Sequence, residues 1–73
     1  MILIDKVGHM VSDSSLEELH EFAKRIFMRR EWFQDKNNHP HYDLTTGNAK
    51  ERALEKGAIM VNSKELAQRM VRQ

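Results

Sequence analysis

The stretch REWFQDKNNHPHYD, residues 30–43, is the part of the chain around which the other segments are organised. It contains the only Trp, the only Tyr and the only Pro, together with two of the four His. Large aromatic side chains here stand beside groups that donate, accept or exchange protons. Because ligand pockets combine apolar walls with a few converging polar groups, this stretch is predicted to form the binding site.

An amphipathic helix is predicted immediately before this stretch, over residues 14–28. Ser15 followed by Glu18 is typical of a capping box at a helix start. His20 lies at the margin of the apolar face, where it is expected either to bond a backbone carbonyl or to reach the edge of a pocket. The apolar positions recur at helical spacing. They are Leu16, Leu19, Phe22, Ala23, Ile26 and Phe27.

The segment before this helix is short and apolar at its start. Residues 1–4 predict a buried strand because two Ile occur in the run. Asp5 ends the run, and its carboxylate either forms a turn or belongs to a site. Gly8 indicates a turn before the helix.

Outward from residue 43, the chain alternates between extended and helical patterns. Residues 31–34 and 41–44 are predicted to be two short extended pieces that pair as a hairpin. A helix over residues 48–56 ends at Gly57, residues 58–61 read as a buried strand, and Asn62 caps a last helix that runs to about residue 72. Residues 1–73 therefore predict one α+β domain with a three- to four-stranded mixed sheet and three helices.

Composition narrows the classes of function. With 12 Lys and Arg against 11 Asp and Glu, the net charge of +1 makes nucleic acid an unexpected partner. No apolar run approaches the length of a membrane span, and the first residues lack a signal-peptide pattern, so we expect a soluble, cytoplasmic protein. A chain of 73 residues without Cys has a small core, which favours a homo-oligomer.

Several spaced pieces of the chain resemble a small bacterial and phage family known as a domain of unknown function. They are His9-Met10 with Asp13, Glu18-Leu19-His20 with Phe22-Ala23, Arg30 with Trp32-Phe33-Gln34, His41-Tyr42-Asp43, Arg52-Ala53 and Gly57-Ala58. Family members usually have Gly where this chain has Phe27, so the turn after the first helix is expected to differ. They also carry a second acidic residue where this chain has Lys6. The resemblance implies that polar residues define the motif, and it brings no activity with it.

The polar and aromatic residues of the motif favour a binder of a small anionic, nucleotide-like ligand. Trp32, Phe33 and Tyr42 can stack on a planar ring, although in an extended piece one of Trp32 and Phe33 is expected to be core. A guanidinium forms bidentate bonds to phosphate. The residues expected to converge on one cleft are Arg30, Gln34, His41, Asp43 and Arg52, with His9 and the aromatic rings beside them.

Two alternatives use the same chain differently. A phosphoester hydrolase would use His41 or His20 with Asp43, since a carboxylate orients an imidazole as general base. This reaction is expected with or without a divalent metal. The spacing His39-x-His41 with Asp43 can present two imidazoles and a carboxylate to such a metal. The other alternative is a phage protein that binds and blocks a host protein. The sequence identifies no cofactor.

Overall fold

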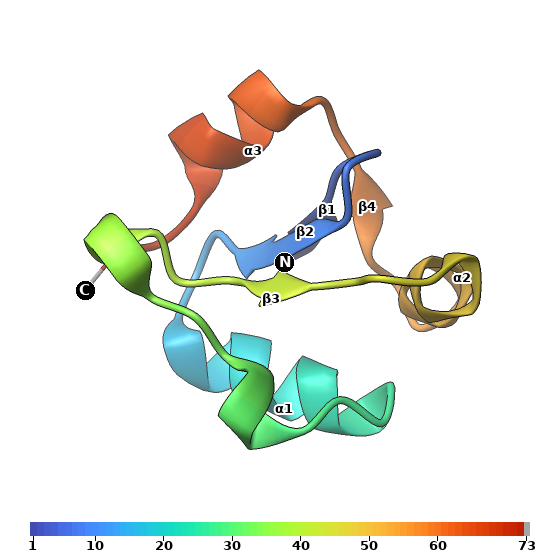
Figure 1. Ribbon diagram of the computed structural model, residues 1–73. Helices are drawn as coiled ribbons and strands as arrows, with labels where there is room; N and C mark the ends of the chain where they lie inside the picture. Colours follow the sequence, from blue (N-terminus) through green and yellow to red (C-terminus); the bar gives the residue numbers. More distant parts are fainter. Residues whose placement is uncertain (73) are drawn as a thin grey trace.

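The computed structural model describes residues 1–72, which form a four-stranded mixed sheet with three α-helices (Figure 1). The strands are β1 (Ile2–Ile4), β2 (His9–Ser12), β3 (Tyr42–Asp43) and β4 (Ile59–Met60). The helices are α1 (Leu16–Arg25), α2 (Gly47–Glu55) and α3 (Ser63–Arg69), and the 3₁₀ turns are η1 (Arg30–Trp32) and η2 (Lys36–Asn38). The predicted α+β class is confirmed.

The sheet has the strand order β3-β2-β1-β4 and is covered on both faces. Neighbours β3, β2 and β1 are antiparallel, and β1 pairs with β4 in parallel. Figure 1 shows α1 on one side of the sheet, α3 on the other, and α2 at one end. Of the helices that the structure describes, each is too short and too polar to cross a membrane.

Successive residues of β1 supply two separate cores. Ile2 and Ile4 pack with α1, whereas Leu3 packs with Val11 and Leu66 under α3. This division follows from the two-residue period of a strand, which sends alternate side chains to opposite faces. All three β1 side chains are buried, and burying an aliphatic side chain of this size contributes about 1.5–3 kcal/mol.

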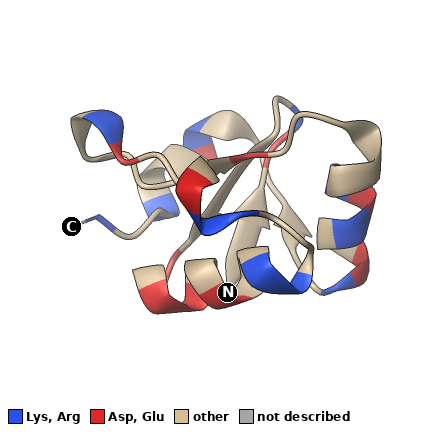
Figure 2. Cartoon of the chain, turned by 60° about the horizontal axis from the view of Figure 1, so that its bottom comes forward, with Lys and Arg blue, Asp and Glu red and all other residues tan. Residues whose placement is uncertain are grey.

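The predicted caps position the helices. Ser15 Oγ accepts a bond from the backbone N–H of Glu18 at 3.1 Å, and Asn62 Oδ1 accepts one from that of Glu65 at 2.8 Å. The Glu18 carboxylate instead accepts bonds from Ser12 Oγ and from the ammonium group of Met1. Glu18 therefore joins β1, β2 and α1 at one corner. Along α1, acidic side chains lie in the first turn and basic ones in the last turn (Figure 2).

Helices α1 and α2 end in the same way with different residues. After α1, the N–H of Met28 bonds the carbonyl of Ala23 at 2.9 Å, with Phe27 at φ +67°. After α2, Ala58 bonds Ala53 at 2.9 Å, with Gly57 at φ +110°. Both are Schellman endings, which favour glycine. The turn after α1 thus keeps the geometry that suits a glycine, although a phenylalanine occupies it.

The structure corrects three local expectations. Residues 9–12 form β2, which the sequence had left unassigned because polar His9 and Ser12 flank only two apolar residues. Residues 31–34 are only partly extended: η1 includes Glu31 and Trp32, Phe33 has an extended backbone, and Gln34 makes a single bridge to His41. Strand β4 exists but is not buried, since Ile59 is 46% and Met60 42% exposed at the sheet edge.

Candidate functional site

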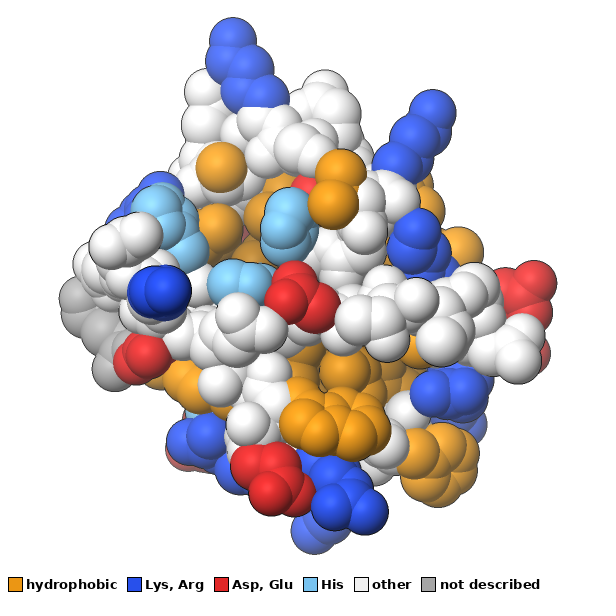
Figure 3. Space-filling view, viewed as in Figure 1, with side chains coloured by type: hydrophobic (Ala, Val, Ile, Leu, Met, Phe, Trp, Pro, Cys, Tyr) orange, Lys and Arg blue, Asp and Glu red, His pale blue; other side chains and the backbone are white. Residues whose placement is uncertain are grey.

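Strand β3 forms a ridge between two hollows in the surface that Figure 3 shows. Tyr42 points into the core, so His41 and Asp43 on either side of it point outward. The Asp43 carboxylate accepts a bond from Gln34 Nε2 at 2.7 Å and stands 3.3 Å from His41 Nε2. Gln34 is held there by paired backbone bonds with His41. Asp43 therefore joins the two hollows.

The larger hollow, here the tryptophan hollow, has a volume of about 580 Å³. The indole of Trp32 is 48% exposed and provides an aromatic wall. Gln34, Asp43 and Arg52 bring polar groups to the same space. The complete lining is Met28, Glu31, Trp32, Gln34, Asp43, Thr45, Thr46, Ala49 and Arg52.

Arg52 is held in position by the end of the first helix. Its Nε donates to the carbonyl of Ile26 at 3.1 Å, inside the turn that Phe27 forms. The N-terminus of α2 faces the same hollow, because Thr46 caps it and lines the wall. A guanidinium and a helix N-terminus both favour a negatively charged ligand.

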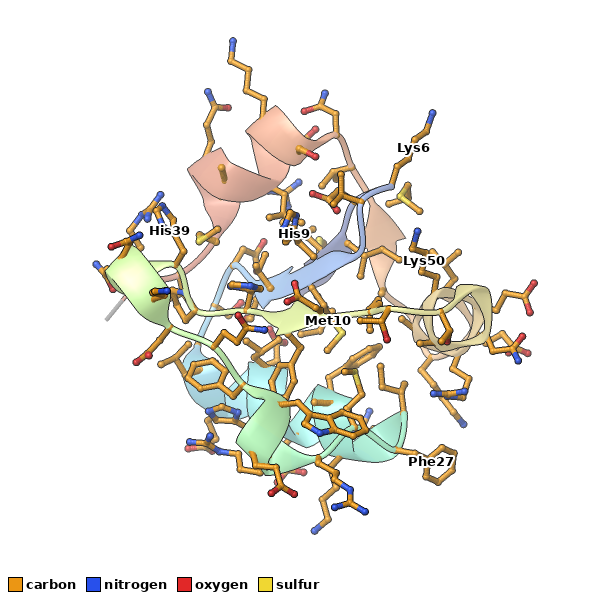
Figure 4. The ribbon with its side chains drawn as sticks, viewed as in Figure 1. Lys6, His9, Met10, Phe27, His39 and Lys50 are labelled. Carbon is orange, nitrogen blue, oxygen red and sulfur yellow. The ribbon has the colours of Figure 1, made fainter. Side chains whose placement is uncertain are left out.

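The second hollow, here the imidazole hollow, has a volume of about 360 Å³. Three of the four His contribute to it from β2 and from the loop before β3. Figure 4 labels His9 and His39, which lie at opposite sides of this opening. The complete lining is Asp5, His9, Val11, Lys36, His39, His41, Ser63, Leu66, Ala67 and Met70.

Asp5 is the buried charge beneath the imidazole hollow. Its Oδ1 accepts bonds from the N–H groups of Gly8 and His9, both at 2.9 Å. Its Oδ2 accepts from Ser63 Oγ at 2.8 Å and stands 3.0 Å from His9 Nδ1. Burial alone would raise the pKa of Asp5, but these bonds, led by that of the His9 side chain, lower the pKa to about 2.

The rings of His9 and His41 meet edge to face, with centroids 5.5 Å apart. Because Asp5 is ionised, His9 Nδ1 carries the proton and donates it, which leaves Nε2 as the basic nitrogen. His41 Nδ1 lies 2.6 Å from the carbonyl of His39, which can only accept, so this nitrogen is also the donor. A carboxylate or a carbonyl thus orients each imidazole.

A third hollow contains His20, Tyr42 and Arg30 on the side of α1. His20 Nδ1 stands 2.8 Å from the Tyr42 hydroxyl, and burial, with a smaller effect of Arg30, lowers the pKa of His20. Tyr42 is fully buried, so its ring has no free face for stacking. Arg30 lies over the ring of Phe33 at 5.0 Å.

The residues proposed from the sequence are therefore divided. Trp32, Gln34, Asp43 and Arg52 share the tryptophan hollow, and His9 and His41 share the imidazole hollow. Arg30, His20 and Tyr42 lie apart from both. As expected, one of the two adjacent aromatics is core and the other is free, because Phe33 packs on the core while Trp32 is exposed.

The spacing His39-x-His41 with Asp43 does not create a ready ligand set. Within residues 1–72, no group of three or more His, Cys, Asp or Glu side chains is arranged to hold a metal ion. The backbone carbonyl of His39, and not its ring, makes the contact with His41.

Sequence reasoning considered Asp5 as a site carboxylate but did not predict how it organises the imidazole hollow. Asp5 does form the turn that was expected, since Gly8 N–H bonds its carbonyl and its side chain. Its carboxylate also orients His9, and the expectation that Asp5 belongs to a site stays a prediction. Ser63 carried no signal, because the bond to Asp5 joins residues 58 positions apart.

A family model described as Protein of unknown function (DUF4031) matches residues 4–73. Because this match covers nearly the whole chain, the protein belongs to that family. No curated protein and no solved structure matches the chain. The function of the protein must therefore be inferred from the site itself.

Proposed function

We propose that the protein binds a small anionic, nucleotide-like ligand in the tryptophan hollow. The observation that carries this proposal is the exposed indole of Trp32 in the same hollow as the guanidinium of Arg52. An aromatic face stacks on a planar base, and a guanidinium holds a phosphate through two parallel bonds. A volume of about 580 Å³ is within the range of small-molecule sites.

Gln34 and Asp43, which line the same hollow, would form hydrogen bonds with the edge of the base. Gln34 donates a hydrogen bond from Nε2 to Asp43, so its amide oxygen can accept a hydrogen bond from the ligand. The second carboxylate oxygen of Asp43 faces His41. A base that presents donor groups at its edge is therefore expected to fit better than one that presents acceptors.

Arg52 replaces Arg30 as the anion clamp in this proposal. Arg30 lines a different hollow and lies over Phe33. Arg52 has its Nε fixed by the carbonyl of Ile26, so its terminal nitrogens are held with little freedom. Such preorganisation reduces the entropic cost of binding.

A thermal-shift panel of purine and pyrimidine mononucleotides tests the proposal. A ligand at a hundredfold excess over its Kd should stabilise the wild type by about 2.7 kcal/mol and raise Tm. Trp32→Ala and Arg52→Lys should each remove most of this shift, because one loses the stacking face and the other the planar fork. Arg25→Ala, at an exposed position of α1 outside the hollow, is the matched control.

Two results would reject this site. One is a ligand shift that survives both substitutions, and the other is loss of the shift in Arg30→Ala with Arg52→Lys unaffected. If no mononucleotide shifts Tm, the host-protein alternative becomes the next hypothesis to test.

The hydrolase alternative also has a specific observation in its favour. His41 and Asp43 stand 3.3 Å apart, as that alternative requires. The ring of His20 contacts the Tyr42 hydroxyl in the third hollow, so the hydrolase alternative is here based on His41. The imidazole that does approach His41 is His9.

We also propose self-association through the edge strand β4. Ile59 and Met60 are large apolar side chains left exposed at an open sheet edge, and such edges readily pair with another strand. Light scattering at high micromolar concentration should show a dimer for the wild type and a monomer for Met60→Lys. A monomeric wild type would contradict this expectation.

A further inference from the structure

The imidazole hollow contains two histidines whose ring nitrogens are fixed for different tasks. His9 donates from Nδ1 to the buried Asp5 carboxylate, so its Nε2 lone pair remains available. Four donors converge on Asp5, which holds this carboxylate and the ring that bonds it in one orientation. A carboxylate that fixes the tautomer of an imidazole is the arrangement found behind general bases.

His41 faces an acceptor at each nitrogen. Its Nδ1 lies 2.6 Å from the carbonyl of His39, and its Nε2 lies 3.3 Å from Asp43 Oδ1. An imidazolium donates to both acceptors at once, whereas the neutral ring with its proton on Nδ1 has no proton on Nε2 to donate to Asp43. The contact with Asp43 is long for a hydrogen bond, so a proton on Nε2 is not committed to this carboxylate and can be donated to a ligand in the hollow.

The two rings are near enough to act on one phosphate group. Their centroids are 5.5 Å apart at an interplanar angle of 81°, and both line one hollow of about 360 Å³. Lys36 lines the same hollow and supplies a positive charge for an anion. Figure 3 shows the pale blue His side chains gathered at this opening beside an acidic side chain.

We propose that the imidazole hollow cleaves ribonucleotide phosphodiester bonds, with His9 as general base and His41 as general acid. The 2′-oxygen of the ribose forms a bond to phosphorus while the bond from phosphorus to the 5′-oxygen breaks. The proton of the 2′-hydroxyl passes to His9 Nε2, and His41 gives its Nε2 proton to the leaving 5′-oxygen. The products are a 2′,3′-cyclic phosphate and a 5′-hydroxyl, and exchange with solvent restores both rings.

The proposed attack by the 2′-oxygen requires a ribonucleotide, and the charge of the chain limits how many phosphates it can contact. A net charge of +1 does not provide the many phosphate contacts of a duplex binder, which is why nucleic acid was not expected from the sequence. One unpaired linkage needs only a local positive group, and Lys36 provides it. The substrate is therefore a short single-stranded oligoribonucleotide. This inference concerns a different hollow from the proposed binding site and does not depend on it.

The test uses a fluorophore–quencher DNA oligonucleotide that contains one ribouridine, with the all-DNA oligonucleotide as matched control. The wild type should cleave only the first, and mass spectrometry should find a 2′,3′-cyclic phosphate at the new end. EDTA should not change the rate. His41→Ala should reduce the rate by about 10²–10⁴-fold, as expected for loss of a general acid.

Further variants separate catalysis from folding. His9→Ala should lose a similar factor, with circular dichroism to check the fold because His9 contacts Asp5. Lys36→Ala should raise KM, whereas Lys64→Ala, an exposed lysine of α3 outside the hollow, should leave the rate unchanged. All proteins are purified in parallel to control for contaminating nuclease.

Four outcomes would overturn the proposal. They are no cleavage of the ribouridine substrate, equal cleavage of the all-DNA control, cleavage that persists in both folded histidine variants, and EDTA-sensitive cleavage that leaves a 5′-phosphate.

Discussion

The two hollows on either side of β3 differ in how firmly their polar groups are held. In the imidazole hollow, the carboxylate of Asp5 is fully buried and accepts four hydrogen bonds. In the tryptophan hollow, the indole of Trp32 is half exposed on a short 3₁₀ turn. Of its polar groups, Arg52 has one bond to a backbone carbonyl and Gln34 one to Asp43.

This difference separates two kinds of chemistry. Proton transfer requires ring nitrogens that are fixed relative to one another, and Asp5 fixes one of them. Ligand binding tolerates side chains that adjust, provided that a flat wall and a charge are present. This difference agrees with the two proposals, which place proton transfer in the imidazole hollow and recognition of a base and a phosphate in the tryptophan hollow.

The turns that support the two hollows also differ in how well their residues suit the backbone conformation. Gly8, beside Asp5, has a φ of +114°, which is suitable for glycine only. Phe27, beside the carbonyl that holds Arg52, has a φ of +67°, which other residues adopt at a cost. The first turn allows no substitution, and the second already carries an unfavourable one.

Substitution of Gly8 should break the imidazole hollow most severely. A Cβ in Gly8→Ala would stand 2.5 Å from the carbonyl oxygen of Leu44, whose N–H bonds the Gly8 carbonyl at 2.6 Å. Strained φ and this clash together should cost about 3 kcal/mol or more. Urea unfolding measures the loss. A change below about 1 kcal/mol would mean that the turn between β1 and β2 is not rigid.

Substitution of Asp5 should separate the two hollows. Asp5→Asn loses an acceptor for His9 and Ser63 and should cost about 2 kcal/mol at pH 7. The folded pKa of about 2 is below the ordinary 3.8, so the carboxylate stabilises the fold above that ordinary value. This contribution disappears as the pH falls from about 4 to 2.

Unfolding free energies of wild type and Asp5→Asn should therefore converge in acid. Glu51→Gln, at an exposed position of α2, is the control and should change stability by less than about 0.5 kcal/mol. Ligand binding in the tryptophan hollow should persist in Asp5→Asn. A constant difference between the two proteins from pH 7 to pH 2 would refute the role given to the Asp5 charge.

Replacement of Phe27 by glycine should slightly increase the stability of the fold. Phe27 is 78% exposed and buries little surface, so Phe27→Gly removes left-handed strain and loses few contacts. We expect about 0.5–1 kcal/mol of added stability after the entropy of glycine is counted, read as a higher Tm. Gly57→Ala is the matched control and should change stability in the opposite direction. Its Cβ would meet nothing within 4 Å, so only the backbone penalty remains.

Destabilisation by Phe27→Gly would show that the exposed ring contributes to the fold. An unchanged Tm in Gly57→Ala would show that these helix endings tolerate any residue.

The helices and the class of fold could be predicted from local sequence patterns. Ser15 and Asn62 cap α1 and α3 as expected, because a cap joins residues only three positions apart. The run of residues 1–4 became β1 since apolar β-branched side chains suit a strand. In the stretch of residues 30–43, which was predicted to form the binding site, every residue except Pro40 and Tyr42 is at least partly exposed.

The grouping of the site residues depends on contacts between distant segments and could not be predicted from the sequence. Strand β2 forms because β1 and β3 lie on both sides of it, and its own sequence of His, Met, Val and Ser is too mixed to show this. Asp5 meets Ser63 across 58 positions, and His9 meets His41 only because β2 pairs with β3. Such contacts depend on strand pairing between distant segments, and local hydrogen bonds and periodicity contain no information about which segments will pair.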